Sequence, residues 1–159
     1  MSYEKMRLHL EEVISRLGMA VQPVFGDENT PPFAYSIGLH AQGLPEVLVF
    51  GLPPEIAAEV LYSIAHHMKT ERAAGRTVSP GIVNLEGFPL PTALVDLAAE
   101  AADDYARAAY DRSGGKAKFF QAVWPDAAGL FPWQDGFDQR FNASQPVVGT
   151  PPAPSTYMH

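Results

Sequence analysis

The sequence predicts a single α+β domain, with a mainly antiparallel sheet and about three helices packed chiefly on one face. The chain has 159 residues, which is the size of one domain, and 47% of them are hydrophobic against 18% charged. Several short segments with strand periodicity come first, followed by a long helical segment, a strand, a helix and a further strand. The 13 glycines and 15 prolines divide the chain into these elements. Their order along the chain is typical of α+β domains.

The first element is an amphipathic helix that should present one buried stripe. Charged residues fill its opposite face, and Gly18 ends it. The apolar residues of the stripe recur at helical spacing and are Tyr3, Met6, Leu10, Val13, Ile14 and Leu17.

Three strands are expected next. Residues 19–25 form the first of them. In residues 33–39 large side chains alternate with small ones, which is the period of a strand with one crowded face. The apolar residues 46–52 form the third strand, and its short connection to the preceding strand predicts antiparallel pairing.

The longest helix begins at Pro53-Pro54-Glu55, where proline and glutamate suit a first helical turn, and Gly75 ends it. One side of this helix is apolar and is expected to be buried. The residues of that side are Ile56, Val60, Leu61, Ile64 and Met68.

The second half of the chain contains shorter elements. A strand is expected around Ile82–Leu85, and Thr92–Val95 fits either a strand or the start of a helix. Residues 98–111 have helical periodicity with a face of small side chains, which suggests close approach to a sheet. Residues 118–124 form a further strand.

The chain is expected to end in an extended tail. Residues 1–145 are assigned to one domain, and the proline-rich residues 146–159 have little apolar surface to bury. The tail should therefore either lie over the domain or remain mobile.

Composition narrows the classes of function. The net charge of −7 and the pI near 5.1 make nucleic acid an unlikely partner, because nucleic-acid binding depends on neutralising phosphates. The absence of cysteine excludes thiolate chemistry and disulfides, and suits a reducing compartment. No secretory signal or membrane span is expected, so the predicted location is cytoplasmic. The sequence indicates no particular cofactor and leaves the oligomeric state open.

Four stretches together carry a family resemblance. They are FAYSIGL (Phe33–Leu39), GLPEVLVFGLPPE (Gly43–Glu55), VWPDAAGLFPWQDGF (Val123–Phe137) and QPVVG (Gln145–Gly149). Their order and spacing resemble the bacterial domain-of-unknown-function family 4262.

This resemblance extends over roughly Gly18 to Gly149 and implies a fold, but no mechanism. Members of the family often have a histidine just before the Pro-Glu pair of the second motif. Leu44 occupies that position here, so the resemblance does not imply histidine chemistry at this point.

Several polar groups are candidates for chemical sites. His66 and His67 are adjacent on a helix, so their side chains diverge by about 100° and they are expected to be a solvated and a half-buried histidine rather than metal ligands. Ser36 and His40 would lie about 13 Å apart along a strand, too far for a nucleophile and its base unless the chain bends sharply. No metal site is predicted.

Aspartates next to proline and glycine favour turn capping over catalysis. Asp126, Asp135 and Asp138 lie in such a context, where a carboxylate commonly accepts hydrogen bonds from its own turn. A general-base or cation-binding role is the alternative.

The tryptophan-rich stretch after residue 122 is expected to fold inward. Large rings bury much apolar area, so most of these aromatics should pack on the sheet, and a smaller number could line a pocket. The stretch is expected to lie beside residues 33–39 and to leave a hollow between the two segments. The rim of this cleft is predicted to consist of Tyr35, Ser36, His40, Glu46, Trp124, Asp126 and Trp133.

The leading hypothesis is therefore a domain that binds a small ligand or a partner segment at an aromatic and polar cleft. One alternative is a hydrolytic or group-transfer enzyme with Asp126 or Glu46 as general base and His40 nearby. A second alternative is a protein-interaction module that uses exposed aromatic side chains and the tail.

Overall fold

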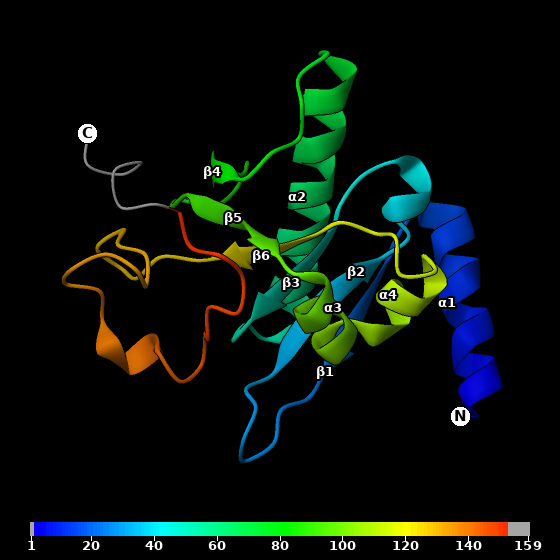
Figure 1. Cartoon of the computed structure of the whole chain (residues 1–159), viewed down its shortest axis with the longest axis horizontal. Helices are drawn as coiled ribbons and strands as arrows, with labels where there is room; N and C mark the ends of the chain where they lie inside the picture. Colours follow the sequence, from blue (N-terminus) through cyan, green and yellow to red (C-terminus); the bar gives the residue numbers. More distant parts are fainter. Residues whose placement is uncertain (1, 153–159) are drawn as a thin grey trace.

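The computed structural model describes residues 2–152 and contains one six-stranded sheet (Figure 1). The strands lie in the order β1-β2-β3-β6-β5-β4, and every neighbouring pair is antiparallel except the parallel pair β3 and β6. Their bounds are Ala20–Val24 (β1), Phe33–Ile37 (β2), Glu46–Phe50 (β3), Gly81–Val83 (β4), Thr92–Leu97 (β5) and Phe119–Val123 (β6). The predicted α+β class with a mainly antiparallel sheet is confirmed.

The helices cover both faces of this sheet. The longest, α2 (Pro54–Ala73), packs on one face. The short helices α3 (Ala99–Tyr105) and α4 (Arg107–Arg112) lie on the other face, and α1 (Tyr3–Leu17) packs at the β1 edge (Figure 1). Two single turns of 3-10 helix complete the fold, at His40–Gln42 and Gln139–Phe141.

Helices pack on both faces of the sheet because the central strands have apolar side chains on both faces. Every residue of β2, β3 and β6 is buried. Alternate residues of a strand point to opposite faces. In β3, Val47 and Val49 thus pack toward α2, while Leu48 and Phe50 pack toward α3 and α4. Of the small helical face expected to approach the sheet closely, Ala102 and Ala109 are buried in this core together with Ala106, whereas Ala108 is exposed.

The predicted buried stripe of α1 is wrong for half of its residues. None of the residues of α1 is fully buried, and Tyr3, Met6 and Leu17 are 83%, 45% and 52% exposed. Only part of the stripe reaches the core, mainly through Leu10 and Ile14. The reason is the position of α1 at the sheet edge, where β1 offers it a narrow surface.

Two elements of the second half differ from their predicted extent. Residues 92–97 form strand β5, which resolves the ambiguity at Thr92–Val95. The helix expected over residues 98–111 is interrupted at Ala106, whose φ of −114° and ψ of 46° end α3 and precede α4.

The segment after Ser144 crosses the sheet and is held by Gln121 of β6. The Gln121 side chain donates to the Pro146 carbonyl (2.8 Å) and accepts from the amides of Val148 and Gly149 (2.9 and 2.8 Å). Thr150 then forms a bridge to Asp96 at the end of β5. The tail was predicted from residue 146 onward, and its last residues, 153–159, lie outside the described residues.

Within residues 2–152, each helix is too short or too polar to cross a bilayer.

Candidate functional site

Glu46 and Ser36 form a buried polar cluster where β2 turns toward β3. The Glu46 carboxylate accepts from the Ser36 hydroxyl (2.7 Å) and from the amides of Gly38, Leu39 and His40 (3.0, 3.1 and 3.3 Å). The Ser36 hydroxyl in turn accepts from the Val47 amide (2.9 Å). The carboxylate thus replaces the backbone partners that the turn would otherwise lack.

This arrangement fixes a loop and leaves neither group free. Ser36 is 0% exposed and Glu46 is 2% exposed. Burial raises the pKa of Glu46, and the hydrogen bonds from Ser36 and the turn amides act in the opposite direction. The sharp bend that would bring Ser36 and His40 together does exist, but it brings the His40 amide to Glu46.

Tyr35 lies on the other side of β2. It packs in the core beneath α3 and α4 and is 5% exposed. Burial raises the pKa of its phenol. Because successive strand residues point to opposite faces, Tyr35 and Ser36 do not face the same space.

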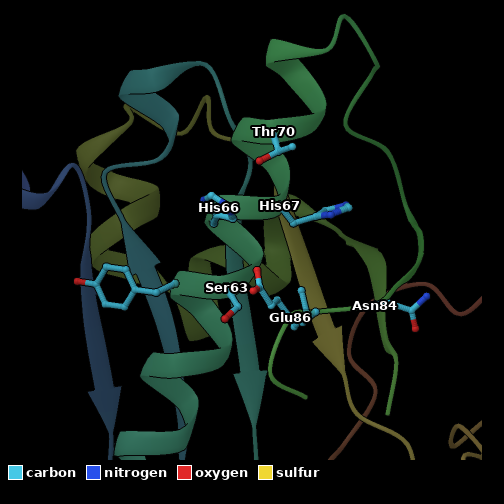
Figure 2. A pocket seen from close by; sticks show the side chains of 8 residues that line it. Ser63, His66, His67, Thr70, Asn84 and Glu86 are labelled. Atoms are coloured by element: carbon cyan, nitrogen blue, oxygen red, sulfur yellow. The ribbon is translucent and has the colours of Figure 1, made fainter. Parts of the chain in front are cut away.

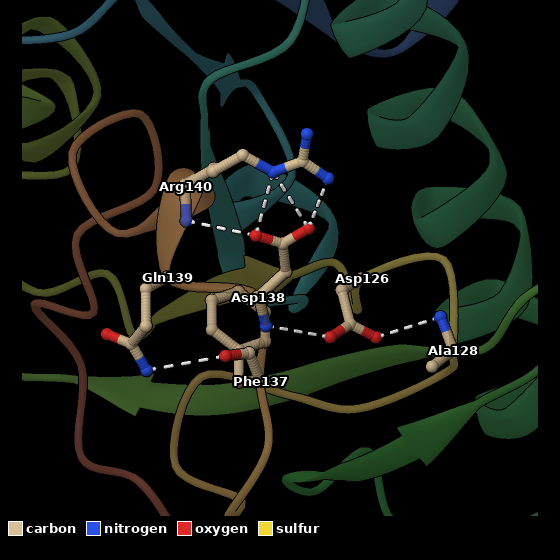
Figure 3. A network of polar contacts seen from close by, with 6 residues as sticks. All are labelled: Asp126, Ala128, Phe137, Asp138, Gln139 and Arg140. Carbon is tan, nitrogen blue, oxygen red and sulfur yellow. Dashed lines mark hydrogen bonds and ion pairs between the residues drawn. The ribbon is translucent and has the colours of Figure 1, made fainter.

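Asp126 organises the tryptophan-rich loop. Its Oδ1 accepts from the amides of Ala128 and Leu130 (3.0 and 2.9 Å), and its Oδ2 accepts from the Asp138 amide (2.9 Å; Figure 3). Hydrogen bonds from backbone amides lower the pKa of Asp126. The largest effect comes from the amide of Leu130, and smaller ones come from the amides of Asp138 and Ala128. This is the turn chemistry that the sequence favoured, extended here to an amide twelve residues away.

The neighbouring Asp138 has a different partner. Its carboxylate pairs with the exposed Arg140 guanidinium (2.6 Å), and this pairing lowers the pKa of Asp138 (Figure 3). Exposed pairs of this kind contribute little to stability.

The two tryptophans occupy different surroundings. The Trp124 indole donates from Nε1 to the Phe50 carbonyl (2.8 Å), which ties the end of β6 to the end of β3. Trp133 stacks on Phe131, with ring centroids 5.3 Å apart and an interplanar angle of 9°. Phe131 and Trp133 cover Ala93 and Val95 of β5. The loop therefore packs on β5 and β6, and β3 separates it from β2.

The seven residues expected at one rim fall into separate groups. Glu46 pairs with Phe119 at the start of β6, whereas Trp124 follows the end of that strand. Five residues of strand correspond to about 16 Å, so the Glu46 and Trp124 groups lie at opposite ends of the parallel pair. Trp124 lines one of the five cavities considered among residues 2–152, and the other six residues line none of these five.

The cavity at Trp124 is an apolar pocket of about 190 Å³ at the carboxyl ends of β3 and β6. Its wall combines the start of α2, the loop before β5 and the segment after β6. Its apolar lining residues include Leu52, Ile56, Val60, Phe88, Leu90 and Trp124. Thr92 is a polar residue in this wall.

Ile56 and Leu90 stand at the surface of this apolar pocket. They are 41% and 37% exposed, although Ile56 was predicted to belong to the buried side of its helix. Ile56 lies in the first turn of α2 and lines the pocket, whereas Val60, Leu61 and Ile64 of the later turns belong to the core. No sequence signal links Ile56 to Leu90, because they belong to separate elements.

A polar cleft of about 420 Å³ adjoins the next turns of α2 (Figure 2). It lies between the helix and residues 84–86, and its polar lining residues are Ser63, His66, His67, Thr70, Asn84 and Glu86. His66 is exposed and His67 is half-buried, as predicted from their adjacent positions on a helix. No local pattern indicates that residues 84–86 lie opposite these histidines, because the two segments belong to separate elements.

Among residues 2–152, no group of three or more histidine, aspartate or glutamate side chains is arranged to hold a metal ion.

Comparison with known proteins identifies the family. The domain of unknown function DUF4262 matches residues 13–138, most of the chain. The chain belongs to this family. The DUF4262 range includes every lining residue of the apolar pocket, from Val49 to Pro125, and also the Asp126 loop. It ends before Gln145–Gly149. No curated protein and no solved structure matches the chain.

Gly51, within the DUF4262 range, allows the C-terminal segment and Trp124 to lie close to the end of β3. Gly51 has a φ of 77°, in the region that favours glycine, and a Cβ at this position would lie 2.5 Å from the Ser144 carbonyl oxygen. The missing side chain lets the C-terminal segment pass close to the end of β3, next to Trp124.

Proposed function

We propose that this domain binds a small ligand through an apolar group, a single aromatic ring or a short aliphatic chain, in the pocket at Trp124. The observation that carries the proposal is the meeting of two motifs in one wall. Leu52 belongs to the motif of residues 43–55, and Trp124 and Pro125 belong to that of residues 123–137. Both motifs are rich in prolines and large apolar residues that a solvent-exposed loop would not need.

The size and lining of the pocket support a small apolar group. A cavity of about 150 Å³ lined by aliphatic and aromatic side chains is large enough for benzene. The pocket here has about 190 Å³ and is lined mainly by carbon. A larger ligand would leave part of its surface outside.

The position of the pocket in the sheet also supports binding. In open sheets, ligands commonly occupy the space beyond the carboxyl ends of parallel strands. β3 and β6 are the parallel pair of this sheet, and Leu52 and Trp124 follow their carboxyl ends.

The carboxylates of Glu46 and Asp126, the two candidate general bases, anchor the backbone around them. Glu46 accepts four hydrogen bonds and Asp126 accepts three, all within their own turns or loops. A general base needs an oxygen within reach of a substrate proton.

Ligand-observed NMR with toluene, ethylbenzene and cyclohexane tests the proposal. We expect saturable binding to the wild type. Ile56→Ala and Leu90→Ala should each weaken it about fivefold, because each removes methyl groups from the pocket wall. Both side chains are more than one-third exposed, so the variants should remain folded.

Phe25→Ala is the matched control. Phe25 is an exposed apolar residue, 81% exposed, that lines none of the cavities described here. Equal affinities for the wild type and for the Ile56 and Leu90 variants, or no binding at all, would contradict the proposal.

A further inference from the structure

We infer that the polar cleft beside the apolar pocket selects ligands that carry a protonated amine next to their apolar group. This inference rests on the proposed function and adds the chemical class of the ligand. Its basis is the arrangement of the apolar pocket and the polar cleft along one helix.

The pocket and the cleft share the same two walls. Val60 of α2 lines the apolar pocket and Ser63 lines the polar cleft, and three residues of helix correspond to about 4.5 Å. On the opposite wall, Phe88 lines the pocket and Glu86 lines the cleft. A ligand of modest length can therefore place a ring near Trp124 and a polar group beside Ser63 and Glu86.

The charge of the cleft favours a cation. Glu86 is the one carboxylate in its lining, and no lysine or arginine lines it among residues 2–152. In Figure 2 the Glu86 side chain points toward the side of α2 that carries Ser63 and His67. The net charge of −7 also favours the approach of cationic ligands over anionic ones.

On the wall that faces Glu86, Ser63 suits the hydrogen-bond pattern of an ammonium group. An ammonium group has three donors and no acceptor. The Ser63 hydroxyl oxygen can accept one of these hydrogen bonds, whereas Thr70 lies about 10 Å farther along α2. A ligand carboxylate would meet Glu86 as a like charge.

Matched pairs of probes test the inference on the intact chain. Benzylamine, 2-phenylethylamine and 3-phenylpropylamine are compared with the corresponding alcohols, with ethylbenzene as the purely apolar probe. We expect at least one amine to bind the wild type about two- to fivefold more tightly than its alcohol, the range for an exposed charge pair. The imidazole resonances of His66 and His67 should shift with that amine and not with ethylbenzene.

Glu86→Gln should remove the preference for the amine while leaving ethylbenzene binding unchanged. Glu59→Gln is the control, since Glu59 is exposed on the same helix and lines neither the pocket nor the cleft. Ethylbenzene binding without any amine preference would overturn this inference and leave the proposed function standing. An amine preference that persists in Glu86→Gln would also overturn it. Absence of binding by every probe would overturn both.

Discussion

The Gln145 side chain pairs with the backbone of Trp124 as a second strand would. Its Oε1 accepts from the Trp124 amide (2.8 Å) and its Nε2 donates to the Trp124 carbonyl (2.9 Å). Gln145 is 2% exposed, so both hydrogen bonds are shielded from water. The pair continues the ladder of β6 by one residue and fixes the backbone that carries the indole at the apolar pocket.

Replacing Gln145 should therefore destabilise the protein. Gln145→Ala leaves the Trp124 amide and carbonyl without their partners, at a cost of about 2 kcal/mol in the free energy of unfolding. Urea denaturation followed by circular dichroism measures the change. Gln139→Ala is the control, because Gln139 is exposed in the same C-terminal region. Equal losses of unfolding free energy for the two variants would show that the pairing with Trp124 does not stabilise the protein more than an exposed glutamine does.

The Glu46 cluster predicts a second loss of stability. In Glu46→Gln one carboxylate oxygen becomes an amide donor, which faces amides or the Ser36 hydroxyl that need an acceptor. Each buried donor left unpaired costs about 1–3 kcal/mol. Denaturant unfolding should show a loss in this range, while Glu55→Gln, at an exposed position, should remain within about 0.5 kcal/mol of the wild type.

The Asp126 loop predicts a dependence on pH. Its backbone partners lower the folded-state pKa of Asp126 below the unfolded value, so its stabilisation is present above the unfolded pKa and is lost as pH falls through the folded pKa. Asp126→Asn should lower the melting temperature at pH 7. Its difference from the wild type should shrink as the pH falls below about 4.

Asp135→Asn separates this effect from a general loss of charge. Asp135 is exposed in the same loop. Its variant should follow the wild type across the pH range. A difference between Asp126→Asn and the wild type that stays constant down to the lowest pH would contradict the assigned role of the carboxylate.

Gly149 predicts a local change without global unfolding. A Cβ at this position would lie 2.7 Å from both the Asp96 carbonyl oxygen and Val95 Cγ2. Gly149→Ala should therefore push the segment off β5 and break the hydrogen bond from the Thr150 amide to Asp96 (2.8 Å). Hydrogen exchange of the Thr150 amide should become about fivefold faster, as expected for losing a bond of about 1 kcal/mol.

Thr150→Ala is the control variant for Gly149→Ala. It changes an exposed side chain of the same segment and keeps the backbone bond. Its exchange should match the wild type. Unchanged exchange at residue 150 in Gly149→Ala would show that the segment adapts without leaving β5.

Much of the fold could be predicted because it depends on local patterns. Alternation predicted β2, and an apolar run predicted β3, each ending within two residues of its predicted limit. The proline start and glycine stop bracketed α2. Residues 92–97 were ambiguous, because a short apolar run fits either state, and pairing with β4 and β6 made them a strand.

The candidate site was predicted much less well. Ser36, Glu46 and Asp126 were selected as chemical groups, and the structure shows where their hydrogen bonds go: into turns and loops. Ile56 and Leu90 were not selected, because an apolar residue gives no sign in the sequence that it will face a pocket. The same holds for Glu86 and Ser63, which line one cleft from separate elements.

The sequence by itself determined the class of fold, the strand and helix positions and the turn chemistry, since these depend on residues within a few positions of one another. Only the tertiary structure decided that Gln145 pairs with Trp124, that α1 lies at an edge and that an apolar pocket adjoins a polar cleft along α2. These features join residues that are tens of positions apart. Their contact depends on how the sheet orders its strands, and local periodicity does not specify that order.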